Sequence, residues 1–108
     1  MTDMAPDGST QVQEEEARRQ QLLTALAKPE RRVILKELAG LKELSPQERS
    51  KRLGARLSNQ SYHFRVLAGL EVIAPTRTER VRGSIKHFYR FAITERWALE
   101  ALGLPPAA

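Results

Sequence analysis

The chain has 108 residues, of which 41% are hydrophobic, 29% are charged and none is cysteine. This length supports one domain with one modest core, and the lack of thiols excludes disulfides and thiolate metal sites. No apolar run approaches the roughly 18 residues needed to span a bilayer, and the acidic N-terminus does not resemble a signal peptide, so we expect a cytoplasmic protein without a membrane partner.

The net charge of +5 is unevenly distributed along the chain. Residues 29–91 contain 14 lysine and arginine residues and 6 acidic residues, a net charge of +8, which leaves −3 for the two ends. A basic middle favours a polyanionic partner, although a solvated basic surface without a partner would show the same distribution.

Residues 1–12 are predicted to form a disordered tail, because they combine Pro, Gly and small polar residues without periodicity. A first helix is predicted from about Gln13 to Lys28, and Glu14 to Glu16 lie in its first turn, where negative charge is favourable. A second short tail is expected at the other end of the chain, over residues 105–108.

Pro29 suits the first position of a second helix, which is predicted to run to Ala39 and to stop at Gly40. The side chains expected to be buried in this helix are Val33, Ile34, Leu35 and Leu38. Two further leucines, Leu41 and Leu44, are expected to pack beneath a loop.

The residues Ser45-Pro46-Gln47-Glu48 form a capping-box sequence that starts a short third helix. This helix is predicted to end near Leu53, and Gly54 then allows a tight turn into a fourth helix over residues 57–69. Gly69 is expected to take a positive φ at its C-terminus. Two short helices around such a turn are typical of a helix-turn-helix.

The fourth helix is amphipathic at a period of 3.6 residues. Its predicted buried face consists of Leu57, Ser61, Phe64, Leu67 and Ala68, and its outer face consists of Ser58, Asn59, Tyr62, Arg65 and Val66. A helix that lies in a DNA major groove needs such a polar outer face, although an ordinary surface helix would also have one.

After Gly69 the period changes to 2, and residues 70–77 and 84–92 are predicted strands joined by a loop from Thr78 to Gly83. A last short helix opens at Thr94 and is ended by Gly103. The element order α-α-α-α-β-β-α is mainly helical with a small β-hairpin, and it predicts a winged helix-turn-helix domain over residues 13–104.

Three segments resemble the ArsR-type winged helix-turn-helix repressors of bacteria. Residues 25–35 are similar to the entry to the family's second helix, residues 61–67 to its recognition helix and residues 82–91 to the return strand of its wing. The chain departs from the family's metal sensors because it has no cysteine, so we expect no metal and no cofactor. Gln60 stands where the family usually has an apolar residue, and Arg56 where it usually has a helix cap.

The resemblance and the basic middle together predict a DNA-binding transcriptional regulator, expected to be a repressor and not an enzyme. Phosphate or base contacts are expected from the fourth helix, at Arg56, Ser58, Asn59, Gln60, Ser61, Tyr62, His63 and Arg65, and from the wing, at Arg77, Arg80, Arg82 and Lys86. For His63 and Gln60, packing inside the domain is an alternative. A protein-interaction module without a specific DNA target is the alternative function.

The family forms a two-fold dimer through its first and last helices, and the resemblance implies a homodimer here. The apolar side chains expected at its interface are Leu22, Leu23, Leu26, Trp97, Leu99 and Leu102. These side chains could instead pack on their own domain.

Overall fold

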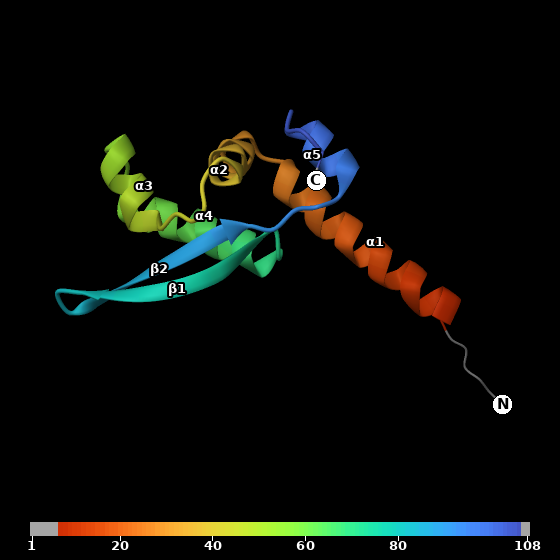
Figure 1. Ribbon diagram of the computed structural model, residues 1–108, viewed down its shortest axis with the longest axis horizontal. Helices are drawn as coiled ribbons and strands as arrows, with labels where there is room; N and C mark the ends of the chain where they lie inside the picture. Colours follow the sequence, from red (N-terminus) through yellow and green to blue (C-terminus); the bar gives the residue numbers. More distant parts are fainter. Residues whose placement is uncertain (1–6, 107–108) are drawn as a thin grey trace.

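The computed structural model describes residues 7–106, and its element order is the predicted α-α-α-α-β-β-α. The bounds are α1 Asp7–Leu26, α2 Pro29–Ala39, α3 Pro46–Leu53, α4 Leu57–Gly69, β1 Ile73–Val81, β2 Ser84–Phe91 and α5 Arg96–Ala101. Figure 1 shows the hairpin extending from one end of the molecule and α1 from the other, with α2 to α4 between them. Among the described residues, no helix is long and apolar enough to cross a membrane.

Helix α1 begins at Asp7, so the prediction of a disordered tail is wrong for residues 7–12. No proline occurs between residues 7 and 28, and the backbone can therefore continue the helix toward the N-terminus. The rest of the predicted tail, residues 1–6, lies outside the described residues, as do residues 107 and 108 at the C-terminus.

Helices α2 and α3 have the predicted bounds, and the capping box is confirmed. The Glu48 amide donates to Ser45 Oγ at 3.0 Å, and the Ser45 amide donates to Glu48 Oε1 at 3.4 Å. The prediction for Val33 is wrong, because its side chain is 53% exposed. The buried positions of α2 are Arg31, Ile34, Leu35 and Leu38, which keep the i, i+3, i+4, i+7 spacing that Val33 breaks.

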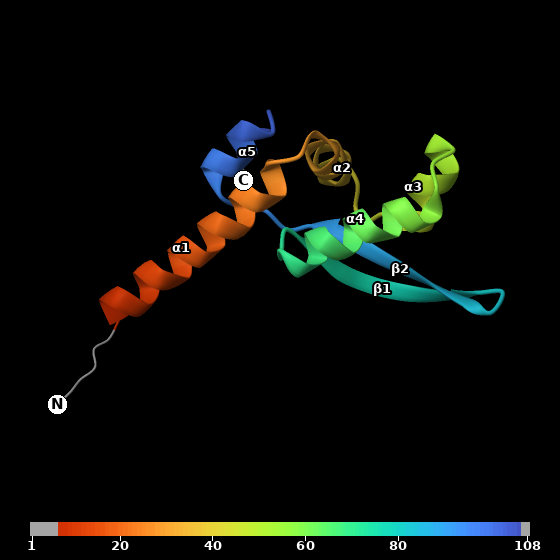
Figure 2. The same cartoon turned by 180° about the vertical axis from the view of Figure 1, so that it is seen from behind.

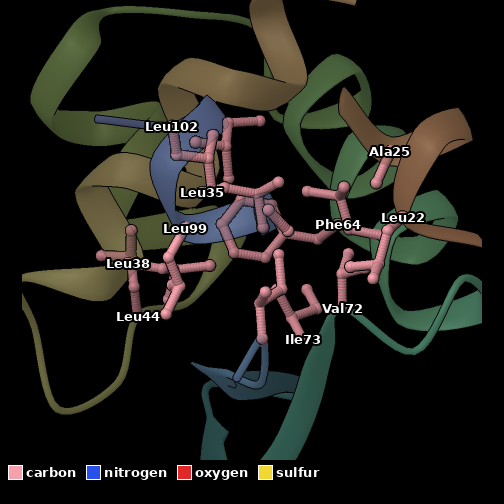
Figure 3. Packing of buried hydrophobic residues seen from close by; sticks show 14 residues of the cluster. Leu22, Ala25, Leu35, Leu38, Leu44, Phe64, Val72, Ile73, Leu99 and Leu102 are labelled. Atoms are coloured by element: carbon pink, nitrogen blue, oxygen red, sulfur yellow. The ribbon is translucent and has the colours of Figure 1, made fainter. Parts of the chain in front are cut away.

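The hydrophobic core lies where α1, α2, α4, α5 and the base of the hairpin meet (Figure 3). Leu44 belongs to this core, and its backbone forms an antiparallel bridge to Tyr89, whereas Leu41 is exposed. Three side chains expected at a dimer interface, Leu22, Leu99 and Leu102, are buried in the chain's own core. For these three the interface prediction is therefore corrected.

The turn of the hairpin is tighter than predicted, and β1 begins at Ile73, three residues later than predicted. Strand pairing continues to Val81 and Ser84, so the expected loop from Thr78 to Gly83 shrinks to Arg82 and Gly83. These two residues have φ angles of 47° and 81°, as in the two-residue turns that match the twist of a hairpin.

The chain leaves α4 differently from the prediction. Gly69 is still helical, and Glu71 takes the left-handed conformation with a φ of 60°. The amide of Val72 then donates to the carbonyl of Leu67 at 3.2 Å, which satisfies the end of the helix and directs the chain into β1.

Candidate nucleic-acid interface

The inner face of α4 holds the helix against the domain through both apolar and polar contacts. Its buried residues are Gln60, Phe64 and Leu67, and the ring of Phe64 lies 5.7 Å from the ring of Tyr89 in β2. Arg49 of α3 donates from Nη1 to Gln60 Oε1 at 2.6 Å and from Nε to Glu37 Oε1 in α2 at 2.8 Å. This network fixes α4 relative to α2 and α3.

The burial of Gln60 contradicts its predicted contact with DNA. The side chain is 2% exposed, and its carbonyl oxygen is already bonded to a guanidinium group. Burial lowers the pKa of Arg49 from its usual value, while the Glu30 carboxylate acts in the opposite direction. Gln60 therefore stabilises the packing of α3 against α4 inside the domain and is not part of the outer surface of α4. The prediction that Leu57 is buried is also wrong, because Leu57 is exposed.

The outer face of α4 is polar and carries the remaining candidates. Ser58, Asn59, Tyr62 and Arg65 are exposed, and Arg56 is exposed at the N-cap position without a side-chain cap hydrogen bond. Ser61 and His63 are half-buried. His63 Nδ1 is buried and has no hydrogen-bond partner within the described part of the chain. Most of the exposed donors and acceptors therefore lie in the first half of the helix.

Two of the four basic side chains predicted for the wing are bound to the protein itself. The Arg77 guanidinium lies 3.8 Å from the centre of the Phe88 ring and pairs with Glu43 at 2.8 Å. Hydrogen bonds from Arg77 and Thr76 hold the pKa of Glu43 below its ordinary value. The Lys86 ammonium lies 3.8 Å from carboxylate oxygens of both Glu48 and Glu79. The pairings with Glu43 and Glu48 are not visible in the sequence, because Glu43 lies 34 residues before Arg77 and Glu48 lies 38 residues before Lys86.

Arg80 and Arg82 are exposed and have no acidic partner among residues 7–106. Arg80 pairs across the hairpin with Ile85, which is 50% exposed. Since side chains alternate along β2, Ile85 lies on the same face as Tyr89, the face that contacts α4. Figure 2 shows α4 in front of the hairpin, and this face extends beyond the helix toward the turn.

Together, the first half of α4 and the outer hairpin present hydrogen-bonding groups beside two exposed guanidinium groups, those of Arg80 and Arg82. Groups of three or more His, Asp or Glu side chains able to hold a metal ion are not found among the described residues. The exposed guanidinium groups beside the polar face of α4 are of the kind that can bind a polyanion.

Comparison with known sequences finds no matching family model and no matching curated protein. Comparison of structures finds the homodimeric winged helix-turn-helix DNA-binding domain of Mb0332 from Mycobacterium bovis, a possible ArsR-family transcriptional regulator. That alignment has a TM-score of 0.64 and 20% identity, and covers 93% of this chain and 84% of the other.

Two further solved structures are similar. Reduced HlyU from Vibrio cholerae aligns with a TM-score of 0.59 and 24% identity, over 86% of this chain and 90% of HlyU. NolR from Sinorhizobium fredii aligns with a TM-score of 0.56 and 23% identity, over 93% of this chain and 91% of NolR. The agreement extends over most of each chain, and the protein therefore has the winged helix-turn-helix fold.

Proposed function

We propose that the protein is a dimeric, sequence-specific DNA-binding regulator of the ArsR-like type that represses transcription. The observation that carries this proposal is the exposed polar face of α4 beside Arg80 and Arg82 of the hairpin, which are exposed and have no ion pair within the described residues. The similarity to the homodimeric DNA-binding domain of Mb0332 supports it. Repression follows physically if the bound protein covers a promoter.

The first half of α4 enters the major groove in this proposal. Asn59 can form two hydrogen bonds to an adenine edge, and Ser58 can pair with several bases. Arg65 and Arg56 reach guanine or phosphate, and Tyr62 reaches phosphate or a thymine methyl group. The half-buried Ser61 and His63 contact the DNA backbone at the edge of this surface.

The hairpin contributes charge in this proposal. Arg80 and Arg82 bind phosphate or enter the adjacent minor groove, because no carboxylate in the described part of the chain competes for them. Arg77 and Lys86 remain candidates for backbone contacts, but each first has to loosen its own ion pairs.

The dimer forms through α1 and α5 in this proposal. Leu23 is exposed on α1, while Leu26 and Trp97 are half-buried beside it, so these three remain available to a second copy. A two-fold dimer places its two α4 helices about one DNA turn apart, and the target is therefore a near-palindrome.

Selection of duplexes from a random pool tests this function, with the selected duplex then measured by fluorescence anisotropy at two salt concentrations. We expect enrichment of a near-palindrome and a steep fall in log affinity with log salt, about 0.9 per phosphate neutralised. The double variant R80A/R82A removes four arginines from a DNA-bound dimer, so it should lower that slope by roughly 3.6 if each arginine neutralises one phosphate. If no duplex is enriched and binding is uniformly weak, sequence-specific regulation is excluded and a protein partner becomes the better explanation.

A further inference from the structure

The N-terminal half of α1 extends into solvent without packing on the domain (Figure 1). Residues 10–17 are all exposed, and the contacts of α1 with the body begin at Arg18 and continue through Leu22 and Ala25. An isolated helical segment of this length is only marginally stable in water, so a second surface is needed to hold it.

A stripe on one side of α1, exposed except at the half-buried Leu26, identifies that second surface. The stripe consists of Val12, Glu16, Arg19, Leu23 and Leu26, spaced four, three, four and three residues apart, which places them on one side of the helix. Val12 is 58% and Leu23 41% exposed. The stripe borders an open hollow of about 620 Å³ beside Trp97, and the Arg19 guanidinium lies 5.2 Å from the Trp97 ring centre.

We propose that a second copy of this chain packs antiparallel along the stripe, with the two-fold axis between Ala17 and Arg18. Glu16 then pairs with the partner's Arg19, and Val12 packs on the partner's Leu23. Each contact occurs twice, because a two-fold interface repeats every pair. This register rests on the dimer of the proposed function and adds which residues meet, independently of whether DNA is bound.

Charge complementarity favours this register over registers shifted by three or four residues. A shift of three residues sets Arg19 against the partner's Arg19, which places like charges in contact. A shift of four residues in the other direction sets Val12 against the partner's Arg19 and brings Glu16 beside the partner's Glu15. Along this stripe, the proposed register joins opposite charges and apolar side chains at the same time.

Charge reversal tests the register in the full chain. Glu16→Arg and Arg19→Glu each place like charges at both polar contacts of a homodimer, so each variant should self-associate about tenfold more weakly, as for two ion pairs replaced by two repulsions. An equimolar mixture should form heterodimers with near wild-type affinity, measured by native mass spectrometry and sedimentation. In the mixture each chain keeps its substitution, and therefore any effect of that substitution on the stability of its own helix. Restored pairing can then come only from contacts between the two chains. Failure of the mixture to restore pairing would overturn the register.

Cysteine crosslinking provides a second test, because the chain has no cysteine of its own. In V12C/L23C the two thiols lie 11 residues apart, about 16 Å along one helix, and cannot form a disulfide within one chain. We expect a covalent dimer on mild oxidation. Q13C/T24C is the matched control, with the same spacing but about 100° further around the helix, and should crosslink much less.

The outcomes separate this proposal from the proposed function. A dimer by light scattering that crosslinks no better through V12C/L23C than through the control would refute the register while leaving the dimer intact. A monomer at micromolar concentration would refute both the register and the dimer. Crosslinking through V12C/L23C without any enriched duplex would support the register and contradict DNA recognition.

Discussion

Arg49 Nη1 donates a 2.6 Å hydrogen bond to Gln60 Oε1, and each of the two residues is 2% exposed. A buried charge of this kind requires full satisfaction. Glu37 and Gln60 supply acceptors from α2 and α4, and the Glu30 carboxylate of α2 lies 3.6 Å from Nη1. The bond therefore couples the helix that carries the candidate DNA contacts to the two helices behind it.

Gln60→Leu should destabilise the domain although leucine suits a buried helical position. The substitution leaves a buried guanidinium N–H without an acceptor, which costs about 1–3 kcal/mol. Urea unfolding measures the change in free energy. Asn59→Leu is the matched control on the exposed neighbour and should stay within about 0.5 kcal/mol of the wild type. Equal stability of the two variants would show that the Arg49–Gln60 bond contributes little.

Asn59→Ala should separate sequence-specific from non-specific DNA binding. If Asn59 forms a bidentate pair with a base, its loss weakens binding to the selected duplex by about 1–3 kcal/mol and leaves binding to random DNA nearly unchanged. Anisotropy with both duplexes measures this difference. A uniform loss on both would assign Asn59 to the phosphate backbone instead.

Local chemistry explains which elements the sequence could predict. The bounds of α2 and α3 depend on Pro29, Gly40, the Ser45–Glu48 capping box and Gly54, all of which act within a few residues of the helix end. The sequence predicts the start of α1 six residues too late, because a polar segment without packing partners lacks the periodicity that marks a helix.

The candidate site was predictable in outline but not in its pairings. For Gln60 the sequence predicts a base contact with internal packing as the alternative, and no spacing rule shows that Arg49, on another helix, is its partner. Arg77 and Arg80 are equivalent in the sequence, yet the β-bulge and the cross-strand position of Phe88 give Arg77 an aromatic face and Glu43 as a partner. Such differences depend on three-dimensional neighbours, which a single sequence does not reveal.

The two kinds of wing arginine should respond differently to substitution. Arg82→Ala removes one exposed charge at the turn of each protomer, so it should lower the salt slope of the dimer by about 1.8 while leaving the unfolding midpoint unchanged. Arg77→Ala removes the cover over Phe88 and the partner of Glu43, so it should lower the midpoint. Unfolding and anisotropy on both variants measure the contrast. A destabilised Arg82→Ala variant would contradict it.

Acid should weaken the attachment of the hairpin through Glu43. Its pKa in the folded protein is lowered from 4.5 by hydrogen bonds from Arg77 and Thr76. The carboxylate therefore contributes stability that is present above pH 4.5 and is lost as the pH falls through the lower folded value. Glu43→Gln should be less stable than the wild type near neutral pH, and the two urea midpoints should converge on acidification.

Glu95 should behave in the same way at the other end of the domain. Partial burial alone would raise the pKa of Glu95, but the hydrogen bond from Arg18 and backbone amides outweigh it, and the pKa lies below its ordinary value. Because Arg18 also donates to the carbonyls of Glu71 and Ala92, Glu95→Gln should loosen α1 from the hairpin base. Glu100→Gln is the control, since its exposed carboxylate has no ion pair within residues 7–106. Urea unfolding at several pH values measures the effect. A difference in urea midpoint between Glu95→Gln and the wild type that does not change with pH would show that the Arg18–Glu95 pair does not contribute through its charge.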